Sequence, residues 1–65
     1  MNPFVIVGNV YERRDGRKAF VYGYDAVSVR YSCVIQGSGE FFSVTEEGKY
    51  LESEDSHNDL VKEIK

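Results

Sequence analysis

The sequence predicts a mostly β fold, in which a curled antiparallel sheet, SH3-like or a partly open barrel, is followed by one short C-terminal helix. Two turn motifs, Arg14-Asp15-Gly16-Arg17 and Glu46-Glu47-Gly48-Lys49, each lie between stretches of alternating apolar residues, which is typical of β-hairpins. A helix-start pattern follows near the C-terminus, at Ser56–Asp59. The 65 residues are enough for one small domain spanning 1–65, and a domain of this length hides only about 60% of the surface of its unfolded chain.

The first hairpin is expected to join strands at Phe4–Tyr11 and Lys18–Tyr24. The first of these segments is rich in β-branched and aromatic residues, which favour strands. Between them, Asp15-Gly16 suits a two-residue type I′ turn, because both central positions of that turn need a positive φ. In the second strand aromatic residues alternate with smaller ones, so three rings are predicted to share one face: Phe20, Tyr22 and Tyr24.

The clearest alternation in the chain predicts a strand over Val27–Gln36, after a corner at Asp25-Ala26. Apolar side chains occur at every second position, with Val34 as the exception, and five residues are expected to point the same way: Val27, Val29, Tyr31, Cys33 and Ile35. We expect this strand to be the central one.

The next turn is predicted at Gly37-Ser38-Gly39, followed by a strand over Glu40–Thr45 in which Phe42 and Val44 face together. Gly48 then suggests a three-residue hairpin with a left-handed glycine, returning through 49–51.

The C-terminal segment has the pattern of a capped helix. Ser56-His57-Asn58-Asp59 resembles a capping box, and a helix is expected over Asp59–Ile64 with an apolar stripe of Leu60, Val61 and Ile64. A helix of under two turns is not stable alone, so it would have to dock on the sheet.

Charge is distributed unevenly along the chain. The net charge is −3, but residues 1–39 carry five basic and three acidic side chains, whereas residues 40–65 carry eight acidic side chains and three lysines. Such asymmetry can steer a charged partner, although a solvated surface with no partner explains it equally well.

The cysteine content and the apolar runs bear on the compartment of the protein. The single cysteine, Cys33, excludes an intramolecular disulfide, and the longest apolar run, Phe4–Val7, is far too short to span a bilayer. We therefore expect a cytoplasmic protein with no membrane partner.

The sequence predicts no catalytic residue, metal site or cofactor. His57 is the only histidine and lies in the expected cap, where a solvated role is more common than that of a general base. Cys33 is expected to face the core and to behave as a small hydrophobe. The acidic residues of 52–59 lack the spacing and glycine of a calcium loop, and Gly37-x-Gly39 has no following helix to form a phosphate loop.

Binding is easier to motivate than catalysis. Nine aromatic residues are more than one thin core can enclose, so some tyrosines should reach the surface, where tyrosine is enriched in protein interfaces. Arginines near the first hairpin could also contact phosphates together with tyrosines, although a charged tip that keeps a sheet edge from aggregating is an equal explanation. The candidate binding residues are Arg13, Arg14, Arg17, Tyr22, Tyr24, Arg30 and Tyr31.

Three segments give the chain a family resemblance: Tyr11-x-x-Arg14-Asp15-Gly16-Arg17-Lys18, the stretch from Ser43 to Leu51, and Ser56–Val61. The combination resembles a group of small accessory proteins encoded by bacteriophages and prophages, from which the chain departs by having no glycine at 52–55. The resemblance marks no catalytic residue. It implies an SH3-like or curled β protein that binds a host protein, including enzymes of antiviral defence.

The first functional hypothesis is therefore a non-enzymatic, phage-type accessory protein that binds a host protein in the bacterial cytoplasm and inhibits or redirects it. The alternatives are a nucleotide or single-stranded nucleic-acid binder and a self-assembling structural protein. A homodimer is also expected, because an open sheet leaves two edges exposed and a symmetric dimer would cover one of them.

Overall fold

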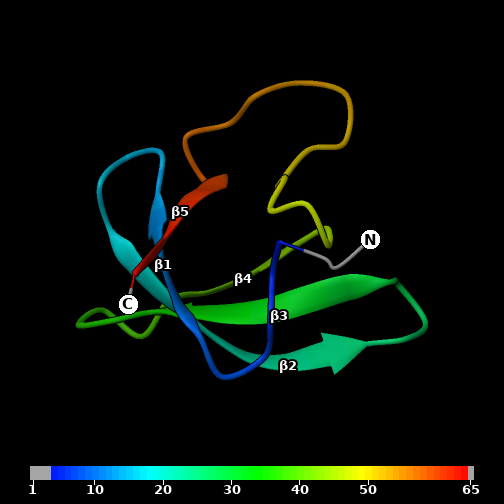
Figure 1. The fold of residues 1–65 in the computed structure, drawn as a ribbon, viewed down its shortest axis with the longest axis horizontal. Coiled ribbons are helices and arrows are strands. Elements are labelled where there is room, and N and C mark those ends of the chain that lie inside the picture. Colours follow the sequence, from blue (N-terminus) through cyan, green and yellow to red (C-terminus); the bar gives the residue numbers. More distant parts are fainter. Residues whose placement is uncertain (1–3, 65) are drawn as a thin grey trace.

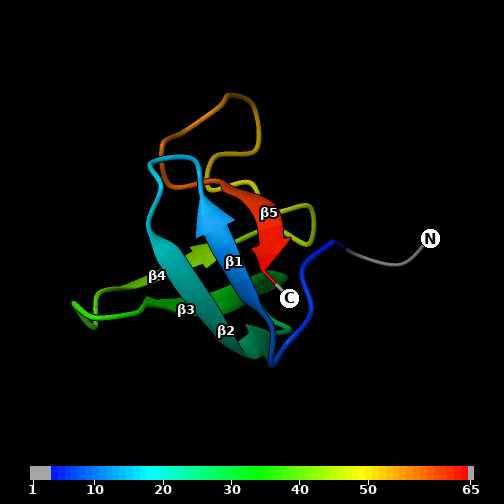
Figure 2. The same cartoon turned by 60° about the vertical axis from the view of Figure 1, so that its left-hand side comes forward.

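Five antiparallel strands form one curled sheet in the computed structural model, which describes residues 4–64. The strand order is β4-β3-β2-β1-β5, so the chain meanders outward from β1 to β4 and then returns to pair β5 with β1 (Figures 1 and 2). The strands are β1 Val10–Arg13, β2 Lys18–Asp25, β3 Arg30–Ile35, β4 Phe41–Val44 and β5 Leu60–Ile64. The predicted curled antiparallel sheet, a partly open barrel, is confirmed.

The predicted C-terminal helix is wrong: residues 60–64 form strand β5. The expected capping contacts do form, because the Ser56 Oγ accepts a hydrogen bond from the Asn58 N–H at 3.2 Å and the Asp59 carboxylate accepts one from the Ser56 N–H at 3.0 Å. Such local contacts stabilise turns as well as helix caps. The β-branched Val61 and Ile64 favour a strand, and β1 offers an edge on which that strand pairs. Residues 4–64 contain no helix that could span a membrane.

Two other strand predictions need correction. The first strand occupies Val10–Arg13 and not Phe4–Tyr11. Residues 4–9 form no strand, and among them Val5 is buried in the core. The strand predicted over Val27–Gln36 begins only at Arg30, because residues 26–29 form a turn. This strand, β3, is also not the central one, since β2 lies in the middle of the strand order. Of the residues expected to face the core from 27–36, Val27 and Val29 are exposed, whereas Cys33 and Ile35 are buried.

The two glycine turns share one geometry. In the first, Gly16 N–H donates to Arg13 O at 2.9 Å and Arg13 N–H donates to Arg17 O at 2.7 Å. In the second, Gly48 N–H donates to Thr45 O and Thr45 N–H to Lys49 O, both at 2.9 Å. Only the glycine of each turn has a positive φ, which is the pattern of a three-residue loop. The three-residue prediction is thus right for 46–48, the type I′ prediction at Asp15-Gly16 is wrong, and residues 49–51 form no return strand.

A β-bulge between Val21 and Gly23 places the tyrosines of β2 on opposite faces. The ring of Tyr22 contacts that of Phe41, with centroids 5.9 Å apart, whereas Tyr24 packs on Tyr31 at 4.8 Å. Tyr31 is in register with the buried Val44, which is three residues from Phe41 on β4 and therefore faces the other way. The prediction that the aromatic residues of this strand share one face is wrong, because a bulge shifts the alternation by one residue.

The core lies on the inner face of the curled sheet and is closed by the N-terminal segment. Val5 is buried there, and the Tyr11 hydroxyl, which donates to Phe4 O and accepts from Ile6 N–H at 2.8 Å each, fixes the segment over the sheet. The buried apolar residues are Val5, Tyr11, Ala19, Val21, Cys33, Ile35, Val44 and Leu60.

The seam between the edge strands β4 and β5 is bridged by the 45–49 turn. Glu46 O accepts a hydrogen bond from Val5 N–H at 3.1 Å, and Gly48 O accepts one from Leu60 N–H at 2.8 Å. The chain then continues through residues 50–59, a loop that arches away from the sheet before it enters β5 and that is called the arching loop below (Figure 1).

Candidate protein-binding surface

The outer face of the sheet carries a row of apolar side chains that crosses all five strands. Strand register places one residue from each strand side by side: Phe41, Val34, Phe20, Val10 and Ile64. Their sequence neighbours Tyr11, Ala19 and Ile35 are buried in the core, and successive side chains of a strand point to opposite faces. This outer apolar row therefore faces away from the core.

The row is most exposed at the β4 edge. Phe41 is 73% exposed, and Tyr22, which contacts it edge-to-face, is 50% exposed. The other four members of the row are half-buried. An exposed aromatic pair that continues into a wider apolar strip is typical of an interaction surface.

The sequence analysis missed this row because it placed Val10 and Phe20 in strands without a register between them and placed Ile64 on a helix. Two signals were present: Val34 broke the alternation of its strand, and Phe41 stood on the face opposite Phe42 and Val44. Both residues lie in the outer row.

Arg13 lies inside the curled sheet. Its side chain is buried, its guanidinium group binds both carboxylate oxygens of Asp15, and its Cζ atom lies 5.1 Å from the centroid of the Phe42 ring. The hydrogen bonds from Arg13 are the main reason that the pKa of Asp15 falls to about 2. This candidate binding residue thus has an internal role in the structure.

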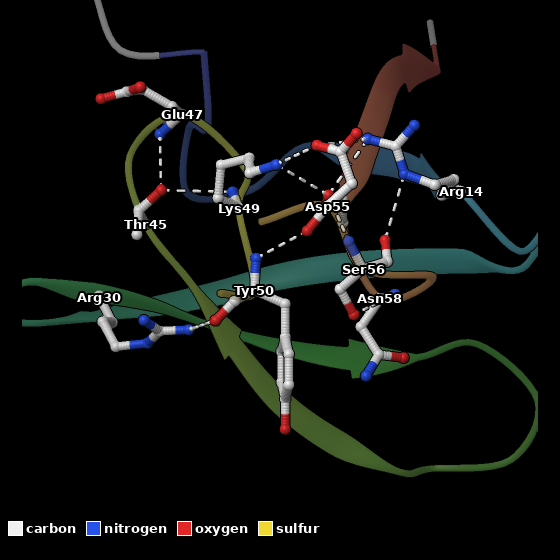
Figure 3. Close-up of polar contacts among 10 residues, drawn as sticks. Arg14, Arg30, Thr45, Glu47, Lys49, Tyr50, Asp55, Ser56 and Asn58 are labelled. Carbon is white, nitrogen blue, oxygen red and sulfur yellow. Dashed lines mark hydrogen bonds and ion pairs between the residues drawn. The ribbon is translucent and has the colours of Figure 1, made fainter. Parts of the chain in front are cut away.

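Arg14 anchors the arching loop to the first hairpin. Its Nη2 atom contacts Asp59 Oδ2 at 3.1 Å and Asp55 Oδ1 at 3.8 Å, and its Nε atom donates to Ser56 O at 3.2 Å (Figure 3). The backbone repeats the connection, because Arg14 N–H donates to Asp59 O at 2.8 Å.

The other candidate residues are spread over the molecule. Arg30 is half-buried and donates to Ser43 Oγ, Ser43 O and Tyr50 O at 2.7–2.9 Å. Arg17 is exposed, and its Nη1 atom lies 3.9 Å from Glu40 Oε1. Tyr24 and Tyr31 pack together on the inner face, whereas the ring of Tyr22 contacts Phe41 in the outer row. A phosphate site receives less support, because Arg13, Arg14 and Arg30 are engaged within the molecule.

Asp59 is the centre of the polar contacts that hold the arching loop. Its carboxylate is buried and accepts hydrogen bonds from Tyr50 N–H at 2.9 Å, Ser56 N–H at 3.0 Å, Arg14 at 3.1 Å and Lys49 at 3.3 Å. Burial alone would raise the pKa of this carboxyl group, but the four donors outweigh it and lower the pKa to about 2. The carboxylate therefore stays ionised at neutral pH and ties three segments together.

The low pKa of Asp59 predicts acid destabilisation. Because its pKa is about 2 in the folded state and about 3.9 in the unfolded state, its contribution is complete above about pH 4 and is lost as the pH falls towards 2. We expect protonation of Asp59 to lower the free energy of unfolding by about 1.5 kcal/mol between pH 5 and pH 2.5. Urea unfolding at the two pH values measures this loss. In the variant Asp59→Asn the decline should be shallower by that amount. The remaining slope comes from the other carboxyl groups whose pKa lies below the ordinary value, Asp15, Asp25 and Asp55. Parallel pH profiles for the two proteins would contradict the assignment.

The two side chains that were considered as catalytic groups, Cys33 and His57, differ in their surroundings. Cys33 is buried, and its burial raises the pKa of the thiol to about 12, so the nucleophilic thiolate does not form at neutral pH. His57 is exposed in the arching loop. Within residues 4–64, no group of three or more metal-ligating side chains is close enough to hold a metal ion.

Comparisons with known proteins gave no match, whether with protein-family models, with curated proteins or with solved structures.

Proposed function

We propose that this chain is a non-enzymatic binding protein that docks its outer apolar row on a protein partner. The observation that supports this most directly is the alignment of five apolar side chains across five strands, ending in the exposed Phe41 and Tyr22. Aromatic residues at the centre of a contact supply much of the binding energy in protein interfaces. The strands hold the row rigidly, so little conformational entropy is lost when it docks.

We further propose that the partner is a host protein and that the chain is a phage-type accessory protein that inhibits or redirects it in the bacterial cytoplasm. The small size and the resemblance of the turn motifs to phage and prophage proteins support this. An enzyme of antiviral defence is the class of partner that the resemblance implies. The homodimer stays a prediction that light scattering at micromolar concentration tests.

The experiment is an affinity capture from a bacterial host with matched tyrosine variants. Tyr22 and Tyr24 are 50% and 49% exposed and lie two residues apart on opposite faces. We expect Tyr22→Ser and Phe41→Ser each to reduce the amount of captured partner at least tenfold, as loss of an interface hot spot does. Tyr24→Ser should retain the partner.

The captured protein is then purified and its activity is measured with and without the chain. Inhibition by the original chain and by Tyr24→Ser, but not by Tyr22→Ser, is the expected result. Equal capture by all of the variants would overturn the outer row as the binding surface. Circular dichroism of each variant shows whether a loss of binding reflects unfolding.

A further inference from the structure

The turn between β2 and β3 presents two valines to solvent. Residues 26–29 form this turn, which lies at the end of the sheet away from β5 (Figure 1). Val27 is 95% exposed and Val29 is 57% exposed. The apolar apex of this hairpin is a feature that the core does not explain.

The apex is held in a strained conformation. Val29 has a φ of 58°, and it is the one non-glycine residue with a positive φ among residues 4–64. β-branched residues rarely adopt this conformation. The Asp25 carboxylate fixes the turn by accepting hydrogen bonds from Val27 N–H at 3.0 Å and Ser28 Oγ at 3.1 Å. Strained residues that the surrounding structure fixes in this way are concentrated at ligand-binding sites.

A groove of about 320 Å³ adjoins the apex, with Val29 in one wall and Glu46, Glu47 and Glu52 among its other lining residues. Within residues 4–64, no ion pair engages these three glutamates. Lys49 also lines the groove, but its Nζ atom is paired with Asp55 at 2.5 Å and with Asp59 at 3.3 Å. The groove is therefore acidic next to an apolar rim.

We propose that the apex and this groove form one docking site for an extended segment of a partner protein in which a lysine or arginine stands beside apolar residues. The cationic side chain enters the groove between the glutamates, and the apolar residues contact Val27 and Val29. Charge complementarity selects this occupant, because the same carboxylates would repel an anionic membrane surface. The inference rests on the proposed function, to which it adds the chemistry of the partner.

A positional-scanning library of nine-residue peptides tests the site without knowledge of the partner. The fluorescently labelled chain is incubated with peptides in which each position is fixed in turn to each amino acid. We expect lysine or arginine, next to an apolar residue, to give at least tenfold more signal than aspartate or glutamate at the same position. The best peptide is then titrated against variants by fluorescence anisotropy.

The variants separate the two parts of the site. Val29→Asn, in which asparagine tolerates the positive φ, should raise the Kd at least tenfold while unfolding at an equal or higher urea concentration. The double variant Glu46→Gln/Glu47→Gln should raise the Kd at least tenfold and flatten its dependence on salt. Val61→Ser removes a partly exposed valine on β5 and should change the Kd by less than twofold.

The site would be overturned by a library without a preference for basic residues, by unchanged peptide binding in Val29→Asn, or by binding to vesicles of anionic lipid in place of peptides. If the chain captures a protein through Tyr22 but the library shows no preference for basic peptides, this docking site is refuted and the outer row is not. Selection of basic peptides without capture that depends on Tyr22 refutes the outer row and supports the apex site.

Discussion

Replacing Asp59 with alanine should lower the free energy of unfolding by about 3 kcal/mol. Losses of this size are typical when one partner of a buried charged network is removed. The substitution leaves the N–H groups of Tyr50 and Ser56 without their acceptor and removes the anion that neutralises Arg14 and Lys49. A domain of this size has a small margin of stability, so a large part of the population should be unfolded or the arching loop detached. Urea unfolding at pH 7 measures the loss.

Asp55 provides a matched control for this experiment. It pairs with the same two cations, Arg14 and Lys49, but its side chain is 76% exposed. Exposed ion pairs contribute little because water screens them, so Asp55→Ala should leave the urea midpoint of unfolding almost unchanged. Equal losses in the two alanine variants would show that the hydrogen bonds of Asp59 do not hold the loop.

Replacing Gly48 with alanine should also cost about 3 kcal/mol, from two causes that act together. Gly48 has a φ of +87°, which an L-residue adopts only with strain. A Cβ atom at this position would lie 2.8 Å from the backbone O of Leu60 and 3.2 Å from the Phe4 ring. The carbonyl oxygen belongs to the first residue of β5, so relief of the clash would displace that strand. Thermal and urea unfolding at pH 7 measure the effect.

Gly37 separates the two causes. Its φ is +97°, but no atom lies within 4 Å of the Cβ that an alanine would add. Gly37→Ala should therefore cost only the backbone strain, about 1 kcal/mol. If both alanine variants lost the same stability, the seam at Gly48 would have to be looser than the contacts with Leu60 and Phe4 indicate.

The sequence predicted the parts of the fold that depend on local chemistry. Both glycine turns were placed correctly because Gly16 and Gly48 supply the positive φ that no neighbouring residue adopts easily. The contacts of Ser56 and Asp59 were also anticipated. Their consequence was not, because a five-residue segment takes its conformation from its partner, and the available edge of β1 lies about fifty residues earlier in the chain.

The candidate site depended on which face each side chain occupies, and that was harder to predict. One bulge after Val21 sends Tyr22 and Tyr24 to opposite faces, and no residue type announces it. Arg13 shares the inner face with Tyr11 by simple alternation, so its burial could have been predicted once β1 was extended to residue 13. The outer row emerges only from the registers of four strand pairs, none of which a single sequence specifies.

The pairing of β1 with β5 has a consequence for synthesis of the protein on the ribosome. Strands β1 to β4 can pair as soon as they leave the exit tunnel. Val10 and Tyr11 of β1 can pair with Ile64 and Glu63 of β5 only after those residues have been synthesised. Until residues 60–64 emerge, Leu60 is missing from the core and Gly48 O lacks its donor. Contacts between such distant residues slow folding, so a nascent chain halted before residue 60 should remain sensitive to proteases.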